Sequence, residues 1–144
     1  MRISCLVLAI LFHTILGASA QLSLKKVLVF SKTMRYHHES IPAGIAAIEK
    51  LGKENGFMVD TSTNSSSFNT SNLKQYKAVI FLSTTGNVLD TIQKVAFQNF
   101  IRSGGGFVGI HSASSTEKSW QWYGKLLGAV FTDHPEPQNG TVWV

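Results

Sequence analysis

The stretch that decides the fold is Gly104-Gly105-Gly106-Phe107-Val108-Gly109-Ile110-His111-Ser112-Ala113. Its three glycines are typical of a helix end, the short apolar run predicts a buried parallel strand, and a turn of small residues then carries a histidine. This order predicts the sharp strand-to-helix corner at which α/β proteins place their chemistry. In α/β-hydrolases the corresponding Gly-x-Ser-x-Gly turn presents a nucleophilic serine. Here His111 takes the central position, so the corner predicts a site without the usual nucleophile.

Apolar runs predict three more strands before this stretch. Residues 26–30 and 77–82 are unbroken apolar segments, which indicates strands that are buried on both faces. Residues 57–60 predict a shorter strand. Strands that alternate with helices give an α/β fold with a mostly parallel sheet.

Helices are predicted between these strands. Ser40 is the expected N-cap of a helix that ends at Gly56, and one helical turn is expected over 72–76. The polar segment 61–71 predicts a surface loop. A third helix is expected over 90–102, and a short one over 120–127. The apolar side expected for the 90–102 helix consists of Ile92, Val95, Ala96, Phe97, Phe100 and Ile101.

The expected architecture is a flavodoxin-like three-layer sandwich with strand order 2-1-3-4, whose ligand crevice lies at the carboxyl ends of the strands. The final residues, 141–144, have the composition of a fifth strand. A strand with no polar cap after it is an unusual end for a domain, so we expect this sequence to be a fragment or a shortened version of a longer domain.

The first twenty residues predict a secretory signal peptide. Arg2 precedes the apolar run 6–16, and Ala18-Ser19-Ala20 is a cleavage site of the A-x-A type. The mature domain would then span 21–144 and be secreted or periplasmic, with no stable membrane anchor. The alternative is an uncleaved anchor, for which this stretch is too short. The only cysteine, Cys5, lies in this segment, so a mature chain would have no disulfide, thiolate metal site or cysteine nucleophile.

Charge argues against a nucleic-acid partner. The formal net charge is +5, but the basic residues are scattered and do not alternate with aromatic residues in a dense run. The glycine triplet precedes a strand, whereas the glycines that bind dinucleotide phosphates follow one and open a helix. The sequence therefore predicts no Rossmann cofactor.

Histidines gather where the carboxyl ends of the strands are expected. His37 and His38 follow the first strand, His111 follows the fourth, and His134 lies in a later loop. Imidazole titrates near neutral pH and binds divalent metals, so this rim predicts either an acid/base pair or a metal site. His38, His111 and His134 are the candidate ligands of a divalent metal. No HExxH motif or fixed His spacing favours a metal, and ordinary loop histidines are the alternative.

Three further side chains are candidates for binding a hydroxylated or anionic ligand. Arg35 and Tyr36 lie in the loop after the first strand, and Trp120 follows the corner at 109–113 closely. Aromatic rings near a polar cleft can stack on sugars, although at helical spacing they more often belong to a core.

Together three segments resemble the ThuA-like (trehalose utilisation) family. They are Tyr36-His37-His38-Glu39-Ser40-Ile41-Pro42, the stretch 104–113, and the run from Trp122-Tyr123-Gly124 to Phe131-Thr132-Asp133-His134-Pro135. The resemblance covers about 25–144. It implies a fold similar to class I glutamine amidotransferases, with His111 in place of their cysteine. It also implies carbohydrate metabolism around trehalose, related disaccharides and their 3-keto derivatives.

The resemblance transfers His38, His111 and His134 as motif positions, with His37, Glu39 and Ser112 as neighbours. The leading hypothesis is a secreted domain that acts on a disaccharide or keto-sugar, with His111 and His38 as catalytic residues. The residues expected to bind substrate are Tyr36, His37, Glu39, Ser112, Trp120 and His134. The alternative is a non-catalytic carbohydrate-binding or interaction domain.

Overall fold

A computed structural model describes residues 25–136 and 139–141 of the chain. The predicted signal peptide, 1–20, lies outside the described residues, as does 142–144 of the predicted fifth strand. The elements follow in the order β1 (Lys25–Phe30), α1 (Ile41–Asn55), β2 (Phe57–Ser62), a 3-10 turn (Ser65–Ser67), α2 (Thr70–Leu73), β3 (Ala78–Leu82), α3 (Thr91–Arg102), β4 (Gly106–Ile110), a second 3-10 turn (His111–Ser115) and α4 (Gln121–Leu127).

The sheet has the predicted flavodoxin-like topology. Its order is β2-β1-β3-β4, and all three pairings are parallel. In register, Leu28 of β1 lies between Asp60 of β2 and Val79 of β3. The parallel pairing confirms that the unbroken apolar runs are strands covered on both faces.

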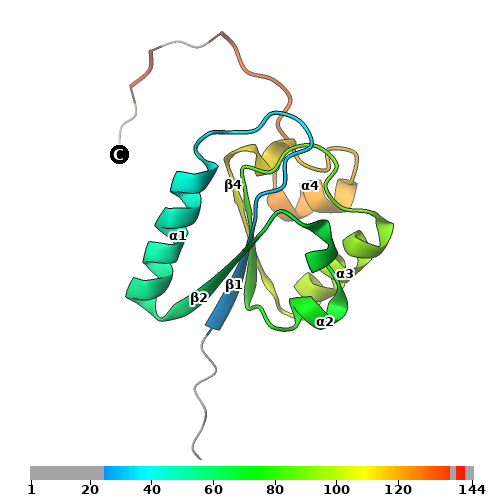
Figure 1. The fold of residues 1–144 in the computed structure, drawn as a ribbon. Helices are drawn as coiled ribbons and strands as arrows, with labels where there is room; N and C mark the ends of the chain where they lie inside the picture. The colour runs from blue at the N-terminus through cyan, green and yellow to red at the C-terminus, as the bar shows by residue number, and fades with distance from the viewer. Residues whose placement is uncertain (1–24, 137–138, 142–144) are drawn as a thin grey trace, which may run out of the picture.

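Helices cover the two faces of the sheet and complete three layers. In Figure 1, α1 packs on one face, and α2, α3 and α4 lie on the other. The apolar contacts divide in the same way, because alternate residues of a strand point to opposite faces. The core under α1 consists of Val29, Ile41, Ile48 and Leu82. The larger core includes Leu28, Phe30, Phe68, Leu73, Val79, Phe81, Phe97 and Tyr123.

Helix α3 begins at the predicted place, but its apolar side is narrower than predicted. Asp90 is the N-cap, and its side chain and that of Gln93 form a reciprocal capping box. Phe97 is fully buried, whereas Ile92 is 80% exposed and Val95 is 50% exposed. Both therefore point away from the sheet, contrary to the prediction.

Of two local predictions on the first half of the chain, one is confirmed and one was wrong. Ser40 is the N-cap residue of α1, as predicted, although its side chain makes no capping hydrogen bond. The segment 61–71 is not a structureless loop: β2 continues to Ser62, and short helical turns follow. Asn64 and Asn69 accept hydrogen bonds from backbone N–H groups of those turns, which supplies their N-caps.

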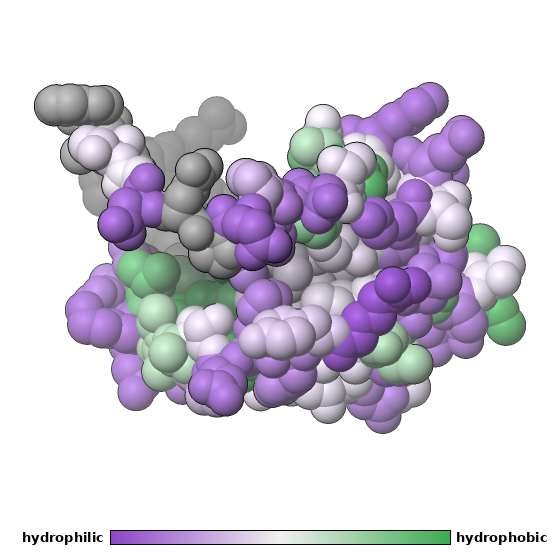
Figure 2. Space-filling model, turned by 90° about the horizontal axis from the view of Figure 1, so that it is seen from above, coloured by the Kyte–Doolittle hydropathy of each residue, from purple (hydrophilic) through white to green (hydrophobic). Residues whose placement is uncertain are grey.

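The loops after β1, β3 and β4 meet at the carboxyl end of the sheet, where the chain after α4 also runs (Figure 1). Figure 2 views this end from above and shows a face made mostly of hydrophilic residues, with smaller apolar patches. Within the described part of the chain, no helix is long and apolar enough to cross a membrane.

Candidate functional site

The corner after β4 places His111 at the carboxyl end of the sheet. The backbone of His111 has φ of 55°, in the left-handed region that residues with a Cβ rarely adopt. Two residues earlier, Gly109 is packed closely: a Cβ there would lie 2.5 Å from Cδ1 of Leu127 and 3.2 Å from Cβ of Ala113. The absence of a side chain at Gly109 lets α4 approach β4. The strained turn begins at His111, directly after the last residue of β4. Strain of this kind costs about 1–3 kcal/mol and gathers at functional sites.

Thr85 holds the loop after β1 against this corner. Its backbone carbonyl accepts from Met34 N–H at 2.8 Å, and its hydroxyl oxygen lies 3.2 Å from the donating N–H of Arg35. The same hydroxyl donates to the carbonyl of Tyr36 at 3.0 Å. These bonds fix the three residues before the His37-His38 pair. Sequence reasoning missed Thr85, because a buried threonine in a polar turn carries no distinctive pattern.

The two loops bring His38 and His111 into ring contact. Their ring centroids are 4.4 Å apart with an interplanar angle of 77°, an edge-to-face arrangement. Tyr36 also packs edge to face against His38, with a centroid distance of 4.7 Å. Desolvation by burial lowers the pKa of His38, and positive charge on His111 and His37 lowers it further. The lowered pKa favours the neutral form of the His38 imidazole.

The histidine pair opens into a pocket of about 520 Å³. Its lining comes from the loops after β1, β3 and β4 and from the chain after α4. The lining residues are Arg35, Tyr36, His38, Thr85, His111, Ser112, Ser114, Ser115, Lys118, Phe131 and His134.

Ser112 contributes a buried hydroxyl to this pocket. Its Oγ has no hydrogen-bond partner among the residues that the structure describes. Buried polar atoms are nearly always satisfied, so an orphaned hydroxyl at a pocket wall calls for a ligand oxygen or a water. A ligand with several hydroxyl or carbonyl oxygens fits this requirement.

The structure brings five of the eight predicted site residues to the pocket wall. These are Tyr36, His38, His111, Ser112 and His134. His37 and Glu39 are exposed and do not line the pocket. Trp120 does not line it either, because its ring stacks on Tyr123 with a centroid distance of 6.1 Å at the edge of the larger core.

The three histidines predicted as metal ligands do not form a common ligand set. Across residues 25–136 and 139–141, no group of three or more His, Cys, Asp or Glu side chains is arranged to hold a metal ion. His38 and His111 meet edge to face. Nδ1 of His134 lies 2.8 Å from the carbonyl oxygen of Pro135, to which it donates.

Four further residues line the pocket although they were not among the site residues predicted from the sequence. Ser114 and Ser115 belong to the 3-10 turn after β4, and Lys118 follows it. Phe131 lies beyond α4, and its N–H donates to the carbonyl of Ser114 at 3.0 Å. A seven-residue helix separates Lys118 from Phe131, and only the fold shows that both face the same pocket.

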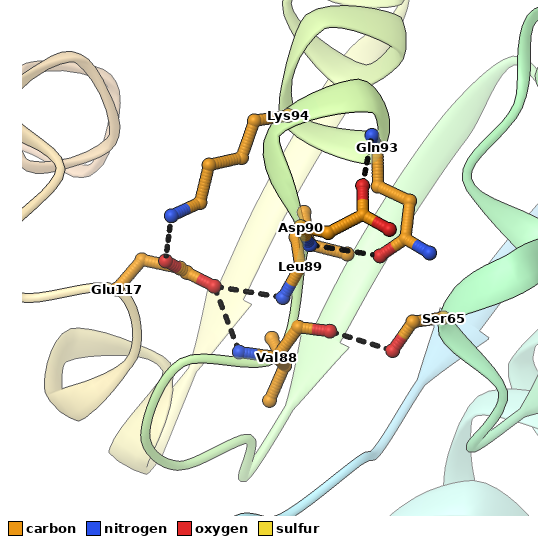
Figure 3. A network of polar contacts seen from close by, with 7 residues as sticks. All are labelled: Ser65, Val88, Leu89, Asp90, Gln93, Lys94 and Glu117. Atoms are coloured by element: carbon orange, nitrogen blue, oxygen red, sulfur yellow. Dashed lines mark hydrogen bonds and ion pairs between the residues drawn. The ribbon is translucent and has the colours of Figure 1, made fainter.

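A buried carboxylate, that of Glu117, connects segments that lie next to the site in the chain. Oε1 of Glu117 accepts from the N–H groups of Val88 and Leu89, at 2.7 and 2.8 Å, and Oε2 lies 2.6 Å from Nζ of Lys94 (Figure 3). These contacts join the loop after β3 and the start of α3 to the segment after the corner. Glu117 is a structural residue, and no sequence pattern predicts that this glutamate lies in the interior.

Comparison with known proteins decides the family. A family model described as "ThuA: Trehalose utilisation" matches residues 26–144. The chain belongs to the ThuA family. A crystal structure of a ThuA-like protein from Bacteroides uniformis is similar to this ThuA-family chain, with 29% sequence identity and a TM-score of 0.55. The match covers 74% of this chain and 44% of the bacterial protein, so this chain corresponds to less than half of that structure. No curated protein sequence matches the chain.

Family membership implies a connection with trehalose-related carbohydrate metabolism. It also agrees with the α/β sheet and with the predicted resemblance. In this ThuA-family chain, His111 stands at the strand-to-helix corner after β4, in ring contact with His38.

Proposed function

We propose that this ThuA-family chain acts on a disaccharide or keto-sugar in the pocket at the carboxyl end of the sheet, with His38 and His111 as its acid/base pair. The observation that carries the proposal is the 4.4 Å ring contact between these two histidines at the wall of a pocket rich in hydroxyl groups. The description of the family, trehalose utilisation, supports a sugar as the ligand.

The reaction that suits this pair is proton abstraction from a carbon next to a carbonyl group. A neutral imidazole nitrogen of His38 takes the proton, and the electrons of the C–H bond form the carbon–carbon double bond of an enolate. The carbonyl oxygen takes the negative charge. In the proposed complex, Ser112 and His111, which both line the pocket, would donate hydrogen bonds to that oxygen and stabilise the charge as it develops. The lowered pKa of His38 favours the neutral form that the step requires.

Sugar binding is supported by the aromatic and hydroxyl groups of the wall. Tyr36 is 70% exposed, and Phe131 is 37% exposed. Both are available to the apolar face of a sugar ring, and Ser114, Ser115 and Thr85 offer hydroxyl partners. The exposed Tyr36 ring also favours a second candidate function, a non-catalytic carbohydrate-binding domain in which the same wall only holds the sugar.

The predicted signal peptide adds a location to the proposal. Its apolar run and A-x-A site support export, so the sugar would be met outside the cytoplasm.

Isotope exchange separates the two candidate functions. The purified chain is incubated in D2O with the 3-keto derivative of trehalose, and NMR follows the loss of the proton next to the carbonyl. We expect exchange that falls at least about a hundredfold in His38→Gln, the range for losing a general base. Lys50→Gln, on an exposed part of α1, serves as the control and keeps the wild-type rate. Saturable binding of the sugar without exchange would contradict the catalytic role and favour the binding domain.

A further inference from the structure

Charge in the pocket has a single sign. Five of its lining residues carry basic side chains: Arg35, His38, His111, Lys118 and His134. No aspartate or glutamate is among the lining residues, although the chain has eight of them, all within the part that the structure describes. A pocket for a purely neutral sugar has no need of this charge.

The nearby carboxylates are directed elsewhere. Glu117, next to Lys118 in sequence, is buried against Val88, Leu89 and Lys94. Asp133, next to His134, accepts from the backbone N–H of His134 at 2.8 Å. Glu117 thus does not neutralise the pocket, and Asp133 lies outside its wall.

The two permanent cations remain available to a ligand. Within residues 25–136 and 139–141, neither Arg35 nor Lys118 forms an ion pair. Nζ of Lys118 lies 5.6 Å from the ring centroid of Phe131, another wall residue, which holds the ammonium group at the pocket. The N–H of Arg35 is bonded to Thr85, which fixes its backbone while the side chain stays exposed.

We propose that the pocket selects a carbohydrate that carries an anionic group, with Arg35 and Lys118 as the counter-charges. This inference rests on the proposed function, and it adds the class of sugar. The anionic group is a carboxylate or a phosphate, because arginine and lysine pair with both. The orphaned hydroxyl of Ser112 supplies a further donor at the same wall.

Calorimetric titration of the whole chain with matched sugars tests the inference. Glucuronate is compared with glucose for a carboxylate, and glucose 6-phosphate with glucose for a phosphate. We expect at least one anionic sugar to bind about tenfold more tightly than its neutral partner, since one charge-assisted hydrogen bond gives that factor. The preference should weaken as salt is raised, because the pocket is open to solvent. The pair of sugars that shows the preference identifies the anionic group as a carboxylate or a phosphate.

Substitutions assign the effect to the pocket. Arg35→Gln and Lys118→Gln should each weaken binding of the anionic sugar several-fold more than binding of glucose. Lys125→Gln is the matched control, because Lys125 is an exposed lysine in the last turn of α4 that does not line the pocket. Equal affinity for anionic and neutral sugars would overturn the inference, and so would a preference that both pocket variants retain.

The same data separate this inference from the proposed function. If glucose or trehalose binds and shifts the NMR signals of His38 and His111, but the anionic sugars bind no better, the inference fails and the proposed sugar site stands. If no sugar of either kind binds, both fail together.

Discussion

Glu117 and Lys94 form an ion pair whose carboxylate is completely buried, while the lysine side chain keeps about a quarter of its surface exposed, and Oε2 and Nζ are 2.6 Å apart. The second carboxylate oxygen accepts from two backbone N–H groups of the loop after β3 (Figure 3). A buried charge that loses its partners is costly, so this pair holds the loop and the corner segment together.

Replacing the buried carboxylate should destabilise the fold. In Glu117→Gln, the shape remains but the charge opposite Lys94 is lost, and an amide N–H2 group faces the ammonium group. We expect a loss of roughly 3–5 kcal/mol in the free energy of unfolding, the range for breaking a buried pair. Urea denaturation followed by circular dichroism measures it.

The exposed pair Lys50–Glu54 on α1 is the control for this prediction. Its side chains are 72% and 51% exposed. Lys50→Gln should change the free energy of unfolding by less than about 1 kcal/mol, as exposed pairs usually do. Equal losses in Glu117→Gln and Lys50→Gln would show that burial of Glu117 contributes nothing.

The left-handed backbone conformation of His111 lowers the stability of the folded protein, and a glycine at this position would remove that cost. At φ of 55°, glycine lacks the Cβ that makes this conformation unfavourable. His111→Gly should therefore be more stable than His111→Ala by about 1 kcal/mol, while both lose the imidazole. Thermal unfolding of the two variants tests this. Identical stabilities would mean that the turn relaxes and that His111 is not held in a strained conformation.

Replacing Gly52 of α1 by alanine should destabilise the protein, although helix propensity alone predicts that it is stabilising. Alanine normally stabilises a helix by about 1 kcal/mol relative to glycine. A Cβ at Gly52, however, would lie 2.7 Å from the backbone carbonyl oxygen of Phe57, which cannot move aside as a side chain would. Gly52→Ala should lower stability by about 1–3 kcal/mol.

Gly44 is the matched control on the same helix. A Cβ there would meet only the methyl groups of Leu82, the nearest at 3.0 Å, and these can shift. Gly44→Ala should lose less stability than Gly52→Ala in the same denaturation experiment. The reverse order would refute the close packing of α1 on the start of β2.

The pKa of His38 predicts how its protonation depends on pH and on its neighbour. Burial and the charges of His111 and His37 lower this pKa from the ordinary value of 6.5, so His38 stays neutral to lower pH than a free histidine. Below 6.5 the folded chain binds fewer protons at His38 than the unfolded chain, so this residue reduces stability as pH falls. A step that uses neutral His38 should likewise lose rate only below that pH.

Removing one of those neighbouring charges should raise the pKa of His38. In His111→Gln, we expect the NMR titration midpoint of the His38 ring to move upward toward 6.5 without reaching it, because burial is the larger cause. His134→Gln should leave the midpoint where it is, because His134 is not among the causes of the shift. A midpoint that does not respond to His111→Gln would contradict the coupling of the two rings.

Sequence patterns predicted most of the framework because the strands of a parallel sheet are unbroken apolar runs, such as 77–82. The corner at His111 could also be predicted, because glycines and small residues surround it. The prediction of a loop over 61–71 was wrong because asparagine and serine, which are frequent in loops, also cap helices. Asn64 and Asn69 are such caps here.

Only part of the site could be predicted from the sequence. The rule that parallel strands end at one edge predicted that His38 and His111 share that edge, although they are far apart in the chain, and the structure shows their ring contact. No such rule applied to Thr85 or Lys118, whose positions depend on tertiary contacts. Trp120 shows the converse: an aromatic residue near the corner packs on Tyr123 and not in the pocket.

The central claim is that the pocket beside the paired histidines is where this chain binds a sugar. The most direct measurement follows the ring NMR signals of His38 and His111 while trehalose, its 3-keto derivative and the anionic sugars are titrated into the protein. The account predicts that at least one sugar shifts both signals together and saturably, with one dissociation constant. If none of these sugars shifts either signal, or if a sugar binds and both rings stay unperturbed, the claim is contradicted.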